Sequence, residues 1–365
     1  TGCVGVFASL LFLLVYRWRR LVFMLGWKKL MAGAVGLGAF AAAMTVFFPE
    51  QVGAGVDKLF HPKEDTHMIR QMLSTEQGLK ITTAGDKDLY VRLTGEEAVP
   101  LRAADAQGRE QALFFHEGGR YYTVKDHAYD YKKDGVVIAE PRFVKTVVTV
   151  NGVNYDALRV VDHQFVYEKD KTWTIVRIGN EYRVYNAFQK VDQLQEIPAV
   201  GFADCQHFGD KRGYIWSRTI PLLKDFIVTG SGPSTFTMIF PNNDYIGKTN
   251  MNYDGVTVTK PHNMYLQIWT QTGLLSLIAF LLLFAWYFVK GLRLYWNRQL
   301  VTVPEKMGMA FMTALFGYMV TGIANDSTVA VAPVFWGMLG LGMAVNRMVV
   351  KERENKNLTR ISTHA

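Results

Sequence analysis

Residues 274–289 read LLSLIAFLLLFAWYFV and are followed by Lys290. The run contains no charged side chain, and it extends upstream to Met264 with only Gln and Thr as polar interruptions. A helix needs about 20 mostly apolar residues to cross a bilayer. The stretch therefore predicts a membrane-spanning helix.

Further apolar runs of nearly this length occupy residues 30–48, 307–323 and 329–345, and a shorter one occupies residues 4–16. A buried core helix is the alternative for any single run, but several in one chain favour a membrane protein. We predict a polytopic α-helical membrane protein with about five spans. Thr1 lies in an apolar stretch with no initiator Met, so we expect upstream elements to be missing.

The composition fits a chain that combines strongly hydrophobic segments with a polar region. Hydrophobic residues make up 49% of the chain and charged residues 20%, and the apolar residues are concentrated towards both ends. There are two cysteines, Cys3 and Cys205. This number excludes a disulfide scaffold and a multi-cysteine zinc or iron–sulfur site.

Lys and Arg flank the predicted spans in segments 17–29, 290–306 and 347–360. Because basic loops stay in the cytoplasm, these segments are predicted to lie inside, and the connections 49–261 and 325–328 outside. Trp and Tyr near the run ends fit the membrane interfaces. The net charge of +8 is then mostly a property of cytoplasmic loops, and it does not indicate nucleic-acid binding.

Six segments follow from these patterns. They are two N-terminal spans, the first truncated (1–48), a linker (49–77), an extracytoplasmic β domain (78–195), an outer membrane-proximal helical loop (196–262), three spans (263–346) and a cytoplasmic tail (347–365).

The large outer block has the pattern of β structure. Short alternating or β-branched runs occupy residues 79–83, 89–93, 121–124, 143–150, 158–161, 172–178 and 182–185. Turn signals separate them at residues 118–119, 134–135, 151–152 and 179–180. We expect an all-β barrel or sandwich of about seven strands, inserted between the second and third spans.

His61, Glu64, Asp65 and His67 resemble a metal cluster, but Pro62 breaks any helical spacing between them. A solvated linker explains the segment better, so no metal site is predicted. The scattered acids of the β block show no carboxylate pair of the kind used in glycoside hydrolysis.

A cationic, aromatic stretch covers residues 211–224. Arg212 and Trp216 are four residues apart and share a helix face, with Lys211 and Arg218 on a neighbouring face. Guanidinium groups bind phosphate bidentately, so the stretch suits a phosphate-bearing lipid. An interfacial helix that only contacts lipid headgroups is the alternative. The Gly230-Ser-Gly-Pro stretch that follows is by itself a turn signal.

A second stretch, residues 260–266, opens the third predicted span. His262 and Asn263 stand at the helix start, where Asn caps and the helix dipole favours anions. A histidine there is kept neutral and can accept a proton. A cap without chemistry is the alternative.

Together these stretches resemble the C-terminal half of the O-antigen ligase and polysaccharide polymerase family. The resemblance covers residues 210–280: an Arg-x-x-x-Trp helix, Gly-x-Gly-Pro, then His-Asn-x-Tyr-Leu leading into a span with Gly273 and Leu274. The chain departs from the family pattern in its β block and in Gln271, where the family often has an acid.

The resemblance implies a multi-pass glycosyltransferase of the bacterial plasma membrane. Its donor would be a glycan on undecaprenyl diphosphate, and its acceptor a hydroxyl on a glycan, a lipid or another surface polymer. No metal or nucleotide cofactor is expected. A further arginine of the family would lie upstream of Thr1.

The resemblance also assigns roles to residues. Arg212 would bind the diphosphate and offset charge on the leaving group, and His262 would orient or deprotonate the acceptor hydroxyl. The expected substrate-binding residues are Lys211, Trp216, Arg218 and Asn263.

A function of a different class is the alternative. A membrane receptor or sensor could bind a surface polymer through the β block, with no catalysis. A ligase and a polymerase share the donor chemistry, so the sequence does not separate them. We expect the β block to bind or position the acceptor, because it is remote in sequence from the Arg212 helix.

Overall fold

The computed structural model describes residues 5–16, 69–76, 78–83, 88–93, 102–104, 110–111, 114–117, 120–123, 128–129, 142–164, 169–296 and 298–362. The chain forms two compact units. Unit 1 comprises residues 1–57, 222–236 and 260–365, and unit 2 comprises residues 58–221 and 237–259.

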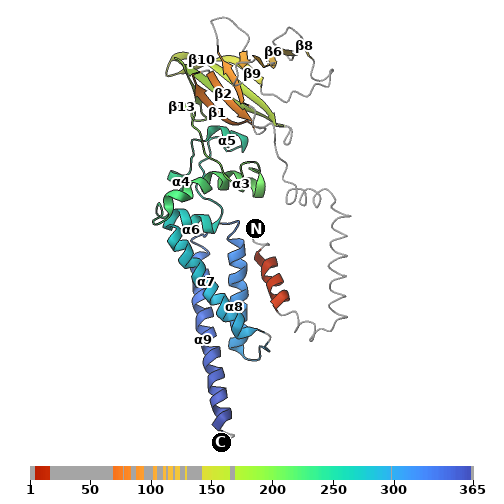
Figure 1. The fold of residues 1–365 in the computed structure, drawn as a ribbon, viewed down its shortest axis with the longest axis vertical. Coiled ribbons are helices and arrows are strands. Elements are labelled where there is room, and N and C mark those ends of the chain that lie inside the picture. The colour runs from red at the N-terminus through yellow and green to blue at the C-terminus, as the bar shows by residue number, and fades with distance from the viewer. Residues whose placement is uncertain are drawn as a thin grey trace. The chain divides into compact units, whose positions relative to one another are not determined.

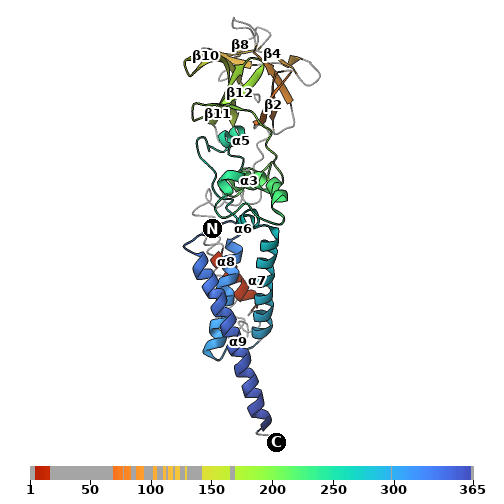
Figure 2. The same ribbon diagram turned by 90° about the vertical axis from the view of Figure 1, so that its left-hand side faces the viewer.

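Unit 1 is helical. Its described helices are Gly5–Tyr16, α6 (Met264–Thr272), α7 (Leu274–Tyr295), α8 (Val303–Thr321) and α9 (Ala332–Ser362). The last three run side by side (Figures 1 and 2). Apolar side chains from these helices form one buried cluster that includes Phe284, Met312, Leu315 and Leu339.

Local sequence explains where these helices begin and end. The Thr302 side chain accepts from the Glu305 backbone and the Glu305 side chain accepts from the Thr302 backbone, a capping box that starts α8. Gly273 separates α6 from α7 with φ 96° and ψ 163°, a conformation that favours glycine. The apolar run predicted as a single span is thus a short helix followed by a long one.

Two of the described helices are long and apolar enough to cross a membrane, α7 and residues 332–359 within α9. Their length and composition fit the predicted membrane-type helices, and the number of five spans stays a prediction. The predicted run 307–323 lies mostly in α8, and the run 4–16 in the shorter helix Gly5–Tyr16. The predicted span 30–48 lies outside the described residues.

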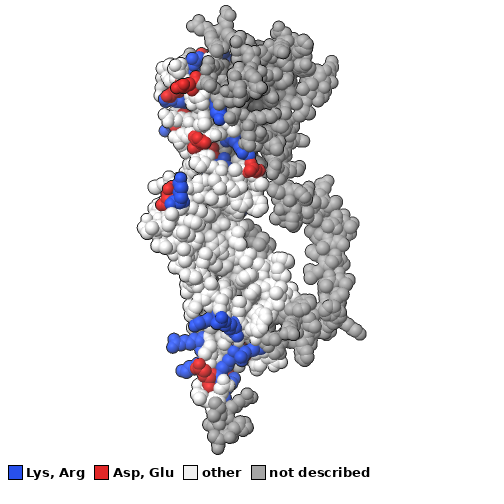
Figure 3. Space-filling model, viewed as in Figure 1, with Lys and Arg blue, Asp and Glu red and all other residues white. Residues whose placement is uncertain are grey.

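Basic side chains gather at one end of unit 1, over the end of α7 and the C-terminal half of α9 (Figure 3). Arg353 joins two of the predicted cytoplasmic segments, because it donates to the Leu294 carbonyl at 2.9 Å and to the Glu305 carboxylate at 2.6 Å. The basic segments 290–306 and 347–360 therefore lie at the same end of the helices, as the predicted topology requires.

Unit 2 contains the β structure (Figures 1 and 2). Its described strands are β1 (Ile69–Thr75), β2 (Gly78–Thr83), β3 (Asp88–Arg92), β4 (Arg102–Ala104), β5 (Glu110–Gln111), β6 (Phe114–Glu117), β7 (Arg120–Thr123), β8 (Ala128–Tyr129), β9 (Arg142–Val150), β10 (Val153–Gln164), β11 (Lys169–Ile178), β12 (Glu181–Tyr185) and β13 (Val191–Gln193). Among the described residues they form sheets β1-β2-β3-β4-β5, β13-β12-β11-β10-β9 and β6-β7-β8, with antiparallel neighbours.

The two five-stranded sheets share one core. Buried Met72 and Ile81 of the first sheet cluster with Leu158, Trp173 and other side chains of the second. Alternation along each strand sends these side chains to one face. Ile246 of α5 (Tyr245–Asn250) completes the cluster, so a helix belongs to this core.

Two of the four predicted hairpin turns, at residues 151–152 and 179–180, occur where they were expected. Asn151 and Gly152 have φ 50° and 79° and join β9 to β10, where Val150 pairs with Val153. Such positive φ values are what two-residue hairpin turns require. The turn at 179–180 joins β11 to β12, whereas those at 118–119 and 134–135 lie outside the described residues.

Two boundaries differ from the prediction. β1 lies in the segment predicted as a linker, and it pairs with β2. Unit 2 also includes α3 (Phe208–Thr219) and α5, beyond the predicted β segment 78–195. The β1 sequence has no strict alternation, and only pairing with β2 reveals it. A β domain that folds without these elements stays a prediction.

Candidate functional site

The start of α3 carries the first group of candidate residues, all within unit 2. Gly209, Asp210 and Lys211 have φ of 60°, 60° and 66°, and regular helix follows from Arg212. Left-handed conformations are uncommon for residues other than glycine and occur at functional sites. The three consecutive positive φ values bend the chain up to and including Lys211, immediately before Arg212.

The Arg212 side chain folds back onto this bend and donates to the Gly209 carbonyl. The Lys211 ammonium lies 4.7 Å from the centroid of the Tyr253 ring. Burial raises the pKa of the Tyr253 hydroxyl, Asp210 raises it further and Arg212 lowers it. Tyr253 thus lies within the electrostatic reach of both α3 charges and stays a neutral hydroxyl at pH 7.

A lysine from the β sheet adds to the positive charge at this place. Burial first, then Lys211 and Lys171, lowers the pKa of His207 to about 4, so this histidine is neutral at pH 7. Lys171 belongs to β11 and donates to the Asn252 side chain. A strand of the β structure therefore lies close enough to the start of α3 to affect His207, whereas acceptor binding by the β block stays a prediction.

Arg218 lies in a different environment on the same helix. Its side chain is 4% exposed, and its Nε donates to Asp244 Oδ2 at 3.0 Å. The Nη1 atom donates to Ser217 Oγ at 2.9 Å, and the guanidinium lies 4.5 Å from the Tyr214 ring centroid. Asp244 also caps α5. These contacts suit an arginine that fastens α3 to α5.

Trp216 is also engaged in packing. It is buried, and its ring centroid lies 5.3 Å from that of Phe202 and 6.1 Å from that of Phe208. The aromatic group holds the chain before α3 against the helix. Of the basic residues predicted on α3, Arg212 and Lys211 are the less buried ones.

The second group lies in unit 1 and centres on His262. Its Nδ1 lies 3.0 Å from Asp326 Oδ2, and the imidazole is 47% exposed while the Asp326 side chain is only 5% exposed. His262 has φ 51°, an uncommon conformation for a residue with a side chain. The pair therefore holds one ring nitrogen against a buried carboxylate and leaves the imidazole open to solvent.

The backbone around this pair is fixed by several hydrogen bonds. Asn263 caps α6, as predicted, because its Oδ1 accepts from the Tyr265 and Leu266 amides at 2.9 Å. Its Nδ2 donates to the Ile323 carbonyl at 2.7 Å, and its backbone amide donates to Asp326 Oδ1 at 3.3 Å. The segment that links α8 to α9 is thus tied to the start of α6.

Gln267 strengthens the same connection. Its Oε1 accepts from the Ser327 amide at 2.8 Å, and its Nε2 donates to the Ser327 carbonyl at 3.4 Å. The Asp326 carboxylate consequently has a fixed position under the histidine ring.

The glycine stretch that follows Thr229 packs on the end of α6. The Ser231 and Gly232 amides donate to the carbonyls of Thr270 and Gln271 at 2.8 and 3.0 Å. A Cβ atom on Gly230 would lie 2.0 Å from the backbone carbon of Gln271. Glycine at this position is explained by close backbone packing, and Gln271 takes part through its carbonyl.

Sequence reasoning missed Asp326. The available signal was an acid in the short connection predicted to lie outside, on the same side of the membrane as His262. Sequence reasoning also missed Lys171, which has no local signal in its strand.

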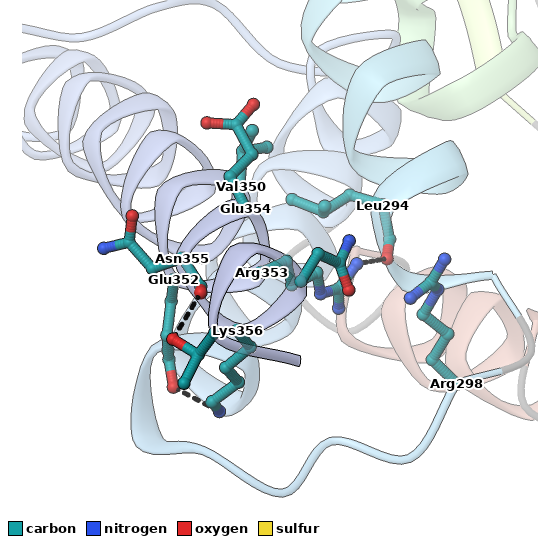
Figure 4. Close-up of a pocket in the computed structure, with 10 residues that line it drawn as sticks. Leu294, Arg298, Val350, Glu352, Arg353, Glu354, Asn355 and Lys356 are labelled. Atoms are coloured by element: carbon teal, nitrogen blue, oxygen red, sulfur yellow. Dashed lines mark hydrogen bonds and ion pairs between the residues drawn. The ribbon is translucent and has the colours of Figure 1, made fainter. Parts of the chain in front are cut away.

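A cavity of about 840 Å³ lies at the other end of α7, lined by Leu294, Arg298 and a stretch of α9 (Figure 4). Its charged residues pair locally, as Lys356 does with Glu352 at 2.7 Å. Within the described residues, no group of three or more His, Cys, Asp or Glu side chains is placed to hold a metal ion.

The apolar helices, the basic start of α3 and the His262–Asp326 pair together define a membrane protein with groups suited to an anion and to a hydroxyl. Residues 183–281 match the family model described as O-antigen ligase. The predicted resemblance to this family is confirmed over the matched segment. No curated protein and no solved structure matches the chain.

The matched segment starts within β12 and ends within α7. It contains Arg212 and His262 and leaves out most of the β structure and Asp326.

Proposed function

We propose that the protein is a membrane glycosyltransferase that moves a glycan from undecaprenyl diphosphate to an acceptor hydroxyl on the outer face of the bacterial plasma membrane. The observation that carries this proposal is the exposed His262 held by buried Asp326, within a chain whose residues 183–281 match the O-antigen ligase family. Transfer to a lipid or another surface acceptor would be ligation, and transfer to a growing glycan would be polymerisation.

His262 acts on the acceptor in this proposal. A neutral imidazole that donates Nδ1–H to the Asp326 carboxylate has its lone pair on Nε2. The acceptor oxygen attacks the anomeric carbon while its proton passes to Nε2, and the bond from that carbon to the diphosphate oxygen breaks. The imidazolium that forms is stabilised by the adjacent carboxylate, because opposite charges attract strongly at short range.

The basic residues at the start of α3 act on the donor. The diphosphate leaves with additional negative charge, which a guanidinium and an ammonium group stabilise. Arg212 and Lys211 have this role, and Lys171 contributes positive potential from the β sheet. The chemistry needs no metal ion, because these cations replace the charge that a metal would supply.

The remaining predicted site residues position these groups. Arg218 and Trp216 fix α3 through buried contacts, and Asn263 fixes α6 and the segment that carries Asp326. The proposal keeps five spans, with residues 49–261 outside, so that both groups face the lipid-linked donor's side of the membrane.

The direct test is a transfer assay with the purified full-length protein, a lipid-diphosphate glycan and two sets of acceptors, with and without EDTA. We expect transfer that EDTA does not abolish, and the acceptor used separates ligase from polymerase. Abolition by EDTA would contradict the metal-independent mechanism. Glycan binding without transfer under every condition would instead support the receptor alternative.

A further inference from the structure

A cavity of about 230 Å³ in unit 2 lies outside the groups described so far. It is formed by β11, the end of β12 with the turn that follows, α5 and the loop after α5. We propose that this cavity binds one uncharged sugar ring of the glycan acceptor. The proposal rests on the proposed function for the identity of that glycan.

Aromatic side chains line the mouth and the wall of the cavity. Phe188 is 59% exposed, and Tyr185 and Tyr245 are half-buried. Exposing a large apolar ring to water is unfavourable, so an exposed aromatic beside a cavity suits a ligand with an apolar face. A pyranose ring has such a face in its C–H groups, and it stacks on aromatic rings.

Hydrogen bonds fix the backbone of the turn that carries the exposed Phe188. The side-chain oxygen of Asn186 accepts from the backbone amides of Phe188 and Lys190, both at 3.0 Å. The Asn186 amide in turn donates to the Lys190 carbonyl at 2.9 Å. Because three hydrogen bonds close the turn, its backbone needs little further ordering when a ligand binds beside Phe188.

Donors and acceptors both line the cavity. Lys248 is 5% exposed and donates to the Asn242 carbonyl at 3.1 Å, and an ammonium group has three N–H donors. Asp254 accepts from Thr249 Oγ1 at 2.5 Å through one of its two oxygens. Burial lowers the pKa of Lys248, while Asp244 and Asp254 raise it. Sugar hydroxyls both donate and accept, so they can satisfy this mixed set.

Charge and size restrict the ligand class. One lysine and one aspartate line the cavity, so the charges of its lining cancel, which disfavours phosphate, uronate and cations. Sites for drug-sized ligands have about 300–1,000 Å³. A cavity below that range fits a single ring, with the rest of a glycan chain extending into solvent.

The test uses the full-length protein in detergent and saturation-transfer NMR with methyl glucoside, methyl galactoside and methyl N-acetylglucosaminide as neutral probes. Glucuronate and inorganic phosphate are the charged comparators. We expect saturable binding of at least one neutral glycoside, with no saturable signal from either comparator. Binding of no neutral probe, or binding of phosphate as tight as that of any glycoside, would overturn the proposal.

Variants place the binding at this cavity. Phe188→Ala and Lys248→Met should each lower the affinity for the neutral glycoside by at least about tenfold. Val153 is an exposed β10 residue that does not line the cavity, so Val153→Ala should leave this affinity unchanged. Phe188 is exposed, so its variant keeps the fold if Lys248→Met does not. Wild-type affinity in a folded Phe188→Ala protein would overturn the assignment.

The same preparations separate this inference from the proposed function. Transfer and donor-lipid binding are measured alongside glycoside binding. If the protein shows glycoside binding that depends on Phe188 but no transfer, the cavity assignment stands and the proposed glycosyltransferase function is wrong. If the protein shows transfer but binds no glycoside at the cavity, the proposed function stands and the cavity assignment is wrong.

Discussion

At the scale of single residues, the histidine at the start of α6 is held by an acid far away in the chain. Asp326 is almost fully buried, and its two oxygens are engaged by the His262 ring and the Asn263 amide. A buried carboxylate destabilises the folded protein unless it is paired. Pairing with Asp326 in turn fixes the orientation of the exposed histidine ring.

His262→Ala should lower turnover about a hundredfold to ten-thousandfold, the range typical of a general base, with little change in donor affinity. Asp326→Asn keeps the side-chain shape and removes the charge. It should therefore lower kcat by a larger factor than it changes KM in either direction. Turnover and donor affinity are measured on the same purified proteins. A His262→Ala protein with wild-type turnover would leave Asn263 capping as the better account of this segment.

Arg212 and Arg218 provide a matched pair on one helix. Arg212→Ala should weaken donor binding while the melting temperature changes little, and Arg212→Lys should restore binding only in part because it lacks the planar fork. Arg218→Ala leaves the buried Asp244 unpaired, so it should cost about 3–5 kcal/mol of stability. Equal effects of both alanine variants on stability and on donor binding would refute this division of roles.

At the scale of elements, the start of α3 combines a left-handed bend with positive charge. Gly209 to Lys211 turn the chain, and Lys211 and Lys171 together with burial disfavour the charged form of His207. The element is therefore suited to an anion, and its stability depends on pH.

His207 has an ordinary pKa of 6.5 in an unfolded chain and a pKa of about 4 in the folded protein. The unfolded chain therefore takes up the proton first, and stability should fall as the pH drops from about 7 to about 4. His207→Gln should flatten this dependence. Melting temperatures of both proteins at pH 7 and pH 5 provide the measurement, and parallel pH profiles would show that another group is responsible.

The β structure depends on elements at both ends of unit 2. Ile69 and Met72 of β1 and Ile246 of α5 lie in its core. Residues 58–259 expressed alone should therefore give a soluble, β-rich fragment, whereas residues 78–195 should be poorly folded. Circular dichroism and dispersion of NMR signals compare the two, and a well-folded short fragment would support the independent β domain expected from the sequence.

At the scale of the whole molecule, charge asymmetry determines the proposed topology. Arg353 of α9 donates to Leu294 and to Glu305, so the basic segments 290–306 and 347–360 lie at one end of the helices of unit 1. Because positively charged ends tend to remain in the cytoplasm, the proposal places the opposite connections outside.

Single cysteines at Gly135 and at Asn357, introduced after Cys3 and Cys205 are replaced by Ser, should differ in labelling by an impermeant thiol reagent on intact cells. We expect Gly135→Cys to react and Asn357→Cys to react only after the membrane is permeabilised. Equal labelling on intact cells would rule out the topology.

The sequence by itself determined the features that depend on local pattern. Apolar runs indicated membrane-type helices, alternation and turn residues indicated most of the long strands, and the order of short motifs indicated the family. Asn263 was predicted as a helix cap because capping involves residues two and three positions away.

Only the tertiary structure decided which distant groups meet. Asp326 lies against His262 because the α8–α9 connection folds back onto α6, Arg218 finds Asp244 on another helix, and Lys171 reaches the charges of α3 from a strand. The resemblance to the family implied roles for Arg212 and His262, but it said nothing of their partners. Hydrophobic periodicity records which face of an element is buried, and it does not record which element covers that face. Pairing of buried charges depends on that second fact, so it becomes visible only in the folded protein.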